Sequence, residues 1–457
     1  MFPANTYQER RAALAGKFDS DLLLFVGNED SPMNCADNIY RFRQDSSFLY
    51  YFGLDQPHLA GLIDIDEQKT ILFGDELTVE HVVWMGPQPA LSDQAEKVGV
   101  SETRPYDELA KYLEKAKSAD RDIHFTPPYR GEKILQLRRW LGTTELAPSE
   151  ALVKAIVEQR LVKSPEEIRQ MEIALAITRQ MHITAMKESR PGIKEAQLAG
   201  QVEGIALATE GQLAYPAILT VNGQTLHNHH HGNVLQSGQL VLGDFGTEAP
   251  HTHYASDITR TWPVDKTFTS QQKEIYQIVL DAEMAVIEAL KPGVRFMDMH
   301  LLAAKIITEG LQKLGLMKGD ADAAVEAGAY ALFFPHGLGH AIGLDVHDME
   351  DLGEDHVGYA GELERSTQFG LKSLRFARTV QPGHVLTVEP GLYFIPELIE
   401  QWQKEQRHAD FINYDKLTPY LNFSGVRIED NVLITEDGHR VLGPAIPKTI
   451  EEVEALR

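Results

Sequence analysis

The chain has 457 residues, a formal net charge of -24 and a hydrophobic content of 43%. This length allows two or three domains and a sizeable core. The negative charge speaks against a nucleic-acid or anionic-membrane partner, which would attract a basic surface. The single cysteine, Cys35, cannot form an internal disulfide, and no apolar run reaches the roughly 18 residues of a membrane span. Without the apolar core of a signal peptide in the first residues, we expect a cytoplasmic protein.

Residues 1–160 alternate short apolar runs with helical stretches, which is typical of a small α/β domain. The run LLLFV at residues 22–26 predicts a buried strand. In GLIDIDEQKTILFG at residues 61–74, two strand-like runs flank the polar turn Asp66, Glu67 and Gln68. This arrangement predicts a β-hairpin.

Residues 161–457 open with a helix-start signal and contain an internal repeat. Ser164 is a cap residue, followed by Pro165 and two acids. The stretch at residues 190–211 parallels the stretch at residues 291–310, because each has a basic residue, Pro-Gly, an amphipathic segment and Glu-Gly. Two copies are too few for a solenoid, so the repeat predicts a duplicated α+β unit with a site between its halves.

Metal-ligand residue types occur on strand-like runs of this second part. They are Asp244 in LGDFG, Asp257 in SDITRTW, His340 in HGLGH, Glu389 in TVEPG and Glu429 in VRIED. Carboxylates are hard oxygen donors that can bridge two cations, and one imidazole makes the pair asymmetric, which suits Mn²⁺ or a similar ion. The set therefore predicts a two-metal hydrolase.

A lone acid is usually a solvated surface residue, but two of these acids follow apolar runs of sequence. Asp244 follows the apolar residues 240–242, and Glu389 follows the apolar run that begins at Val385. A carboxylate at the end of a buried strand is costly unless it is neutralised, and a dication is the strongest available partner. This favours metal binding over the surface alternative.

The motifs LGDFG, SDITRTW, PHGLGHAIGLDVHD, LTVEPGLYF and GVRIEDNVLIT together resemble the pita-bread metallopeptidases, the family of methionine aminopeptidase, aminopeptidase P and prolidase. The segments FRQDSSFLYYFGLDQPHLAGLI and VVWMG resemble the amino-terminal domain of aminopeptidase P and prolidase, which methionine aminopeptidases lack. The resemblance implies an α+β protein: an N-terminal creatinase/prolidase-like α/β domain at 1–160 and a pita-bread catalytic domain at 161–457.

The resemblance also implies a role for each ligand. Asp257, His340 and Glu389 resemble ligands of one metal, Asp244 resembles a ligand of the other metal alone, and Glu429 resembles a bridging carboxylate along with Asp257. Two divalent ions in such sites share a water and hold it as hydroxide against a peptide carbonyl. Glu389 would be the general base. We expect Mn²⁺, with Co²⁺, Zn²⁺ and Fe²⁺ as alternatives.

Other side chains resemble the family's substrate machinery. His227, in LHN, resembles a group near the scissile bond, and His347 resembles the donor to the developing oxyanion. His336, Tyr215 and Arg427 are expected to contact substrate or to support the ligands. An alternative interpretation of the neighbouring histidines at residues 229–231 is a polar loop that binds metal ions adventitiously.

Arg375 is expected to decide the length of the substrate. The segment around it resembles prolidase more than aminopeptidase P, which implies that Arg375 binds the free carboxylate of an Xaa-Pro dipeptide. Its alternative is a surface arginine with a carboxylate neighbour. The alternative activity is an aminopeptidase that releases the first residue of longer Xaa-Pro peptides. A non-catalytic member would have lost ligands, and all are present here.

The resemblance finally implies a homodimer. Trp84, in VVWMG, falls where the N-terminal domain of related enzymes reaches a neighbouring subunit's active site.

Overall fold

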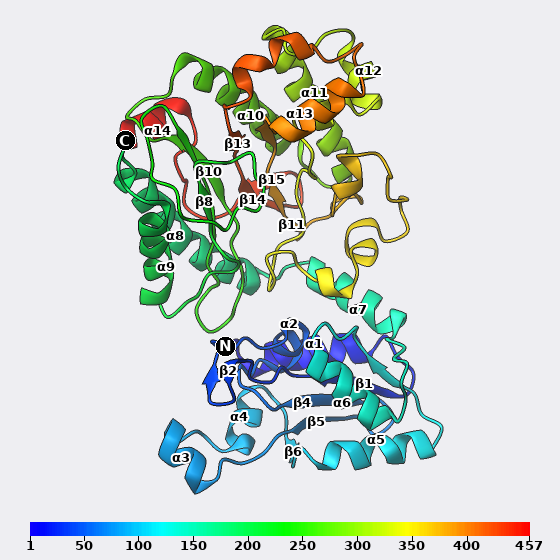
Figure 1. The fold of residues 1–457 in the computed structure, drawn as a ribbon. Coiled ribbons are helices and arrows are strands. Elements are labelled where there is room, and N and C mark those ends of the chain that lie inside the picture. The colour runs from blue at the N-terminus through cyan, green and yellow to red at the C-terminus, as the bar shows by residue number, and fades with distance from the viewer. The chain divides into compact units, whose positions relative to one another are not determined.

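All 457 residues are described by the computed structural model, and the chain divides into two compact units. The first unit comprises Met1–Arg160 with Asp351–Gly353, and the second comprises Leu161–Glu350 with Glu354–Arg457. Figure 1 shows the ribbon coloured along the chain. No helix in either unit combines the length and the apolar character needed to cross a bilayer.

The first unit is built on a five-stranded mixed sheet in the order β6-β5-β4-β1-β7. Its strands are β1 (Leu22–Val26), β4 (Ala60–Asp64), β5 (Lys69–Phe73), β6 (Glu102–Arg104) and β7 (Ile123–Phe125), and a separate ribbon pairs β2 (Pro32–Cys35) with β3 (Asn38–Ile39). Strands β4 and β5 pair antiparallel, so the predicted hairpin is confirmed. Every residue of β1 is buried, as the apolar run indicated.

Helices accompany this sheet in the sequence and supply part of its core. They are α1 (Ala4–Ala15), α2 (Ser46–Phe52), α3 (Val79–Met85), α4 (Leu91–Lys97), α5 (Glu108–Ser118), α6 (Gly131–Leu141) and α7 (Glu150–Leu161). Leu109 and Leu113 of α5 lie one helical turn apart, so they face the same way and join Leu137 of α6 in a core cluster with β1. Helix α3 is the exception, because none of its residues is buried.

The second unit contains two successive sets of paired helices followed by strands. The first set is α8 (Pro165–Glu188), α9 (Glu195–Ala208), β8 (Ile218–Thr220), β9 (Leu240–Asp244) and β10 (Thr259–Pro263). The second set is α10 (Ser270–Ala289), α11 (Phe296–Lys313), β11 (Val385–Val388), β12 (Gly391–Tyr393), β13 (Gly425–Arg427), β14 (Asp430–Ile434) and β15 (His439–Val441). The remaining helices are α12 (Ala321–Glu326), α13 (Pro396–Lys404) and α14 (Ile450–Leu456).

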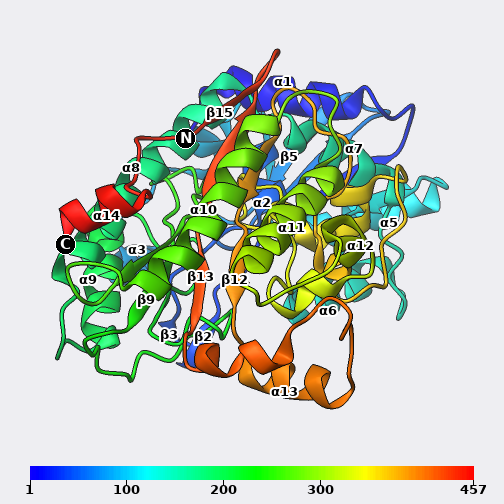
Figure 2. The same ribbon diagram turned by 90° about the horizontal axis from the view of Figure 1, so that it is seen from above.

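Local geometry supports the duplication that the sequence indicated. The two Pro-Gly turns have the same left-handed backbone, with φ of +91° at Gly192 and +88° at Gly293, a conformation that glycine adopts without steric cost. The amide of Gly192 donates to the carbonyl of Leu235, and the amide of Gly293 donates to that of Val380. Helix α8 begins with the predicted cap, since Ser164 and Glu167 form a reciprocal capping box. Figure 2 shows α10 beside α11 and over β12 and β13.

Three antiparallel sheets bring strand ends together in the second unit. Their orders are β10-β9-β8, β11-β14-β15 and β12-β13. Asp244 lies opposite Thr259 in the first sheet, and Val388 lies opposite Asp430 in the second. The amide of Glu429 donates to the carbonyl of Thr259 at 3.1 Å, so the turn between β13 and β14 is joined to a strand of the first half.

Candidate active site

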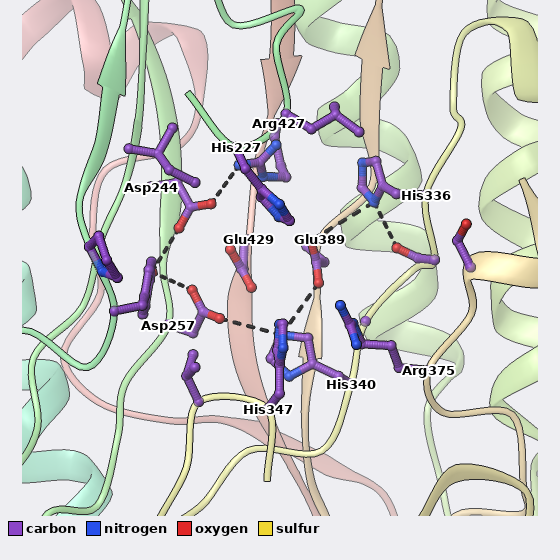
Figure 3. A pocket seen from close by; sticks show the side chains of 18 of the residues that line it. His227, Asp244, Asp257, His336, His340, His347, Arg375, Glu389, Arg427 and Glu429 are labelled. Atoms are coloured by element: carbon purple, nitrogen blue, oxygen red, sulfur yellow. Dashed lines mark hydrogen bonds and ion pairs between the residues drawn. The ribbon is translucent and has the colours of Figure 1, made fainter. Parts of the chain in front are cut away.

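The five predicted ligand residues line one cavity of about 530 Å³ in the second unit. Asp244 ends β9, Asp257 precedes β10, Glu389 follows β11, and Glu429 lies between β13 and β14. His340 lies in a loop bonded to β11, because its amide donates to Thr387 Oγ1 at 3.0 Å. Figure 3 shows their side chains directed toward one another. The structure therefore collects acids that are up to 185 positions apart in the sequence, from Asp244 to Glu429.

Three of these residues are close enough to share one ion. A ligand atom from each of Asp257, His340 and Glu429 lies within 4.8 Å of the other two. His340 Nε2 is 3.4 Å from Asp257 Oδ2 and 3.5 Å from Glu389 Oε1. His340 Nδ1 is 3.1 Å from the Ala341 carbonyl. If Nδ1 carries the proton that this contact requires, the lone pair of Nε2 faces the acids, as in metal-binding histidines.

The donor set fits a divalent cation. Glu429 Oε1 is buried and has no hydrogen-bond partner, although its other oxygen accepts from Thr259 Oγ1 at 2.7 Å. A buried carboxylate oxygen without a partner is costly, and a dication would remove that cost. His340 and Asp257 are also buried, so water compensates little for the charge of this cluster and a cation would do so.

Burial raises the pKa of all four ligand carboxylates. For Glu429 and Glu389 the pKa lies well above its ordinary value, first because of desolvation and then because of neighbouring negative charges. Desolvation also raises the pKa of Asp244 against the opposing effect of Arg427, and that of Asp257 against a hydrogen bond from Tyr215. Acids that are costly to ionise alone become good ligands once a cation neutralises them.

Tyr215 lies against two of the acids. Its hydroxyl oxygen is 2.7 Å from Asp244 Oδ1 and 2.5 Å from Asp257 Oδ1. One hydroxyl has one proton to donate, so it serves only one of these carboxylates at a time. Burial and the adjacent acids raise the pKa of Tyr215 well above its usual value, which keeps it a donor. That Tyr215 also contacts the substrate stays a prediction.

Arg427 joins the two halves of the site. Its Nη2 donates to Asp244 Oδ2 at 2.5 Å, its Nη1 donates to the hydroxyl of Tyr393 at 2.8 Å, and its Nε donates to Thr259 Oγ1 at 3.1 Å. Because Thr259 in turn donates to Glu429, Arg427 contacts one ligand directly and another through a hydroxyl. All three of its nitrogens are thus engaged within the protein.

The three further histidines line the same cavity. His336 Nε2 lies 2.9 Å from the Tyr393 hydroxyl and its Nδ1 lies 2.8 Å from the Gly337 carbonyl. Burial lowers the pKa of His336 to about 3 and also lowers the pKa of His227 and of His347. The ring of His347 packs against that of His340, a predicted ligand, with 4.3 Å between centroids. Each of the three is therefore placed to meet a substrate.

Arg375 lines the cavity and is paired with two glutamates. Its Nη1 donates to Glu350 Oε1 and to Glu354 Oε1. Glu350 also accepts, through Oε2, from His347 Nδ1 at 2.7 Å. The hydrogen bond from His347 and the nearby cations outweigh burial, which alone would raise the pKa of Glu350, and lower this pKa to about 2. The sequence analysis missed both glutamates, although Glu350 stands three residues after His347, a spacing that a tight turn brings together.

Of the histidines in the loop at residues 229–231, only His229 lines the cavity. His231 Nε2 lies 3.1 Å from the Ala217 carbonyl, and the His230 amide donates to Asn228 Oδ1. Neither contact tests whether the loop takes up metal.

Comparison with known proteins gives matches over both units. The model described as "Metallopeptidase family M24" matches residues 169–436, and the one described as "Aminopeptidase P, N-terminal domain" matches residues 7–124. The chain is 35% identical to a Homo sapiens Xaa-Pro dipeptidase, covering 95% of this chain and 88% of the relative. It is 32% identical to an Escherichia coli Xaa-Pro aminopeptidase, covering 98% and 97%.

Solved structures resemble the whole chain. Zn-substituted Escherichia coli aminopeptidase P in complex with product has a TM-score of 0.81 and 30% identity, covering 100% of this chain and 98% of that one. Aminopeptidase PepP from Pseudomonas aeruginosa has a TM-score of 0.82 and 29% identity, with the same coverage. The expected α+β architecture, a pita-bread domain preceded by an aminopeptidase P type N-terminal domain, is confirmed. With the predicted ligand acids lining one cavity within the matched region, the chain belongs to metallopeptidase family M24.

Proposed function

We propose that the protein is a dinuclear metallopeptidase that hydrolyses the Xaa-Pro bond, preferentially in dipeptides. The observation that carries this proposal is Arg375, which lines the same cavity as the ligand acids. Its hydrogen bonds within the protein use Nη1, and none uses Nε or Nη2. Two parallel N–H groups match a carboxylate, so the free carboxylate of a C-terminal proline suits this position.

The ligand set assigns distinct tasks to the chain's own groups. Divalent ions bound there would polarise the scissile carbonyl and lower the pKa of an attacking water. Asp244, Asp257, His340, Glu389 and Glu429 would hold these ions, with Asp257 and Glu429 proposed as the bridging pair. The side chain of Glu389 is 18% exposed, against 8% for Asp257, so Glu389 is the carboxylate best placed to meet water.

Hydrolysis then requires a group that carries a proton from the attacking water to the leaving nitrogen. It also requires a group that stabilises the negative charge developing on the carbonyl oxygen. Glu389 takes one proton from the attacking water and delivers it to the proline nitrogen as the C–N bond breaks, so that proline leaves as a secondary amine. The water's oxygen and its second proton stay on the new carboxylic acid, which releases that proton to solvent. His347, whose Nδ1 already donates to Glu350, donates through Nε2 in its protonated form to the carbonyl oxygen as negative charge develops on it. His227 contacts the substrate near the scissile bond, and His336 and Tyr215 support that contact from the cavity wall.

An Xaa-Pro bond requires specialised recognition. Proline has no amide hydrogen and a fixed φ, so sites that read the backbone N–H after the scissile bond gain nothing from it. Recognition must use the end of the peptide instead, and Arg375 supplies a charge for that purpose.

Hydrolysis of two peptides by the Mn²⁺-loaded protein tests the assignment. We expect Ala-Pro to be cleaved much faster than Ala-Pro-Ala, and a chelator to abolish both activities. Faster cleavage of the tripeptide would overturn the preference for dipeptides, and cleavage of neither would overturn the Xaa-Pro assignment.

The second candidate is an aminopeptidase acting on longer Xaa-Pro peptides. The observation that favours it is the pairing of Arg375 with two glutamates, which reduces the positive potential that a free carboxylate would feel. Substitution of Arg375 by Ala separates the candidates. A dipeptidase should show a raised KM for Ala-Pro and nearly unchanged turnover of Ala-Pro-Ala, whereas an aminopeptidase should show no change with Ala-Pro.

Manganese is the metal we propose, because four carboxylates and one imidazole form a predominantly hard ligand set. Co²⁺, Zn²⁺ and Fe²⁺ are the alternatives, and supply affects which one is bound. Metal analysis of protein purified without added metal, followed by reloading of the stripped protein with each ion, tests this choice. Highest activity with Zn²⁺ would contradict it.

We also propose that the protein forms a homodimer. Helix α3 leaves large apolar side chains uncovered, with Val79 81% exposed, Val83 74% and Trp84 79%. Contiguous exposed apolar residues mark interaction sites more often than they remain free in solution. Val83→Asp should convert a dimer to a monomer in analytical ultracentrifugation, and a wild-type monomer at micromolar concentration would refute the proposal.

A cytoplasmic location stays a prediction. It is based on the single Cys35, which is an exposed free thiol, since such thiols persist in reducing compartments. Fractionation of the source cells tests it.

A further inference from the structure

A tight turn carries both His347 and Glu350 at the edge of the cavity. The amide of Glu350 donates to the His347 carbonyl at 3.2 Å, and Met349 between them is buried with a left-handed φ of +63°. This backbone brings two side chains three residues apart to the same side, where His347 Nδ1 and Glu350 Oε2 are 2.7 Å apart. A non-glycine residue holds a left-handed conformation only where its surroundings fix it.

The opposite side of this turn is anchored in the core. The Asp348 side chain accepts from Lys163 Nζ at 2.8 Å, and both side chains are 1% exposed. The amide of Asp348 donates to the Ala341 carbonyl at 2.8 Å. These contacts fix the backbone of the turn, and this backbone sets the direction in which the Glu350 side chain extends.

Glu350 and Glu354 together occupy one nitrogen of Arg375. Each glutamate contributes one carboxylate oxygen that accepts from Nη1, and no hydrogen bond within the protein uses Nε or Nη2. Arg365 holds Glu354 in turn through a 2.6 Å contact from Nη2 to Oε2. With Nη1 fixed by two acids, the guanidinium plane has a defined orientation, and the edge formed by Nε and Nη2 remains for another acceptor.

We propose that Glu350 and Glu354 are positioning residues that present the Nε and Nη2 edge of Arg375 to the terminal carboxylate of the substrate, and that Glu350 also fixes the ring of His347. The inference rests on the dipeptidase activity proposed above and extends it to two residues that do not touch the substrate. A carboxylate bound side-on to Nε and Nη2 makes two parallel hydrogen bonds. Glu350 therefore links the group that recognises the peptide's end to the group that acts on its carbonyl.

The two glutamates have separable effects under this proposal. Glu354 contacts Arg375 but not His347, so its loss should weaken carboxylate binding alone. Glu350 contacts both, so its loss should weaken carboxylate binding and slow the chemical step. A general structural role would instead affect all substrates in the same way.

The test compares Glu354→Gln, Glu350→Gln and the control Glu203→Gln, an exposed glutamate on α9 with no hydrogen bond. Each Mn²⁺-loaded protein is assayed with Ala-Pro and with its amide, Ala-Pro-NH₂, which has no terminal charge. For Glu354→Gln we expect KM for Ala-Pro to rise roughly tenfold, as for loss of one charge-assisted hydrogen bond, with kcat and both constants for the amide unchanged. Glu350→Gln should raise KM for Ala-Pro similarly and also lower kcat on both peptides.

Coupling to Arg375 provides the second part of the test. In an Arg375→Ala background, Glu354→Gln should have no further effect on KM for Ala-Pro, because the group that it positions is absent. Isothermal titration should likewise show weaker binding of L-proline, but not of prolinamide, to Glu354→Gln than to wild type. Unfolding midpoints of all variants establish that each protein is folded.

Several results would overturn the inference. Equal changes in KM with Ala-Pro and its amide would indicate a general structural role, and a lower KM for Ala-Pro would show that the glutamates compete with the substrate. Failure of the wild type to cleave either peptide would refute the proposed function, whereas an active wild type with an unchanged Glu354→Gln variant would refute only this inference. If the wild type is inactive, equal proline binding by both proteins still counts against it.

Discussion

Arg427 Nη2 donates to Asp244 Oδ2 at 2.5 Å, and the two side chains are only 4% and 11% exposed. Arg427 ends β13 in the second half of the duplicated unit, and Asp244 ends β9 in the first. Desolvation opposes the charge on each partner, but the acids around Arg427 outweigh that effect and keep its pKa well above the usual value. The pair thus places a permanent cation beside the four acids that we propose as metal ligands.

Replacement of Arg427 by Met should destabilise the metal-free protein more than the metal-bound one. Removing one partner of a buried ion pair leaves an uncompensated charge and costs about 3–5 kcal/mol. Bound Mn²⁺ would supply part of the missing positive charge, so urea unfolding with Mn²⁺ should show a smaller loss than unfolding with a chelator. The control, Arg169→Met, removes an exposed arginine from a surface pair and should change little. Equal losses in both conditions would contradict this account.

Asp244→Asn should reduce metal content without emptying the site. An amide oxygen is a weaker ligand than a carboxylate, and Asp244 is proposed to serve only one of the metals, so elemental analysis should find about one ion lost of two. Asp257→Asn, at a proposed bridging ligand, should lower the occupancy of both. Asp298→Asn changes an exposed acid and should leave metal content at the wild-type level. Full occupancy in Asp244→Asn would remove that residue from the ligand set.

Gly358 is the position where a single methyl group should disturb Arg375. A Cβ built on Gly358 would lie 1.8 Å from the Arg375 carbonyl oxygen, and the Gly358 carbonyl accepts from the Ala377 amide at 2.8 Å. Because both contacts are with backbone, Gly358→Ala must shift the segment that carries Arg375. We expect a higher KM for Ala-Pro and a lower unfolding midpoint.

The matched control for that substitution is Gly200→Ala. Gly200 lies within α9 and a Cβ there meets nothing within 4 Å, so alanine should stabilise the helix by up to about 1 kcal/mol. The KM for Ala-Pro and the thermal unfolding midpoint, measured on both variants, test this prediction. An unchanged KM in a folded Gly358→Ala protein would show that the close approach does not set the position of Arg375.

The sequence was sufficient to predict the fold and the acids that line one cavity, because each signal was local. Apolar runs ending in Asp244 and before Glu389 indicated buried acids, and the repeated Pro-Gly units indicated the duplication that brings them together. These patterns and the motif resemblance predicted the architecture, and the comparisons with known proteins confirm it.

The network beyond the ligands was not predictable in the same way. Arg427 was expected to contact substrate or to support the ligands, but the sequence did not indicate that its partner is Asp244 on another strand. Arg375 was expected to bind a substrate carboxylate, with a carboxylate neighbour as the alternative, but the sequence did not identify Glu350 and Glu354 as the groups that accept from its Nη1. Such contacts depend on how loops pack in three dimensions, and neither periodicity nor motif spacing reports that packing.

A buried pair in the first unit should make stability depend on pH. Lys133 Nζ donates to Asp45 Oδ2 at 2.7 Å, and the side chains are 5% and 11% exposed. Burial alone would raise the pKa of Asp45, but the Lys133 ammonium and the amide of Phe48 outweigh it and the pKa is lowered. The stability that this pair contributes is therefore present above the unfolded pKa of about 3.9, and is lost as the pH falls through the lower folded value.

Lys133→Met should cost about 3–5 kcal/mol at pH 7, because Asp45 would remain buried without its ion-pair partner. In that variant only Arg160 and the Phe48 amide oppose burial, so the Asp45 pKa lies above its wild-type value. The variant therefore regains stability as protonation neutralises the acid, while the wild type loses stability at still lower pH. Urea unfolding at a series of pH values should show the difference narrowing toward pH of about 4. The double variant Lys133→Met/Asp45→Asn keeps an acceptor for the Phe48 amide and should recover much of the loss at pH 7. A difference that stays constant with pH, or a double variant no more stable than the single one, would mean that Lys133 acts through packing rather than through the charge of Asp45.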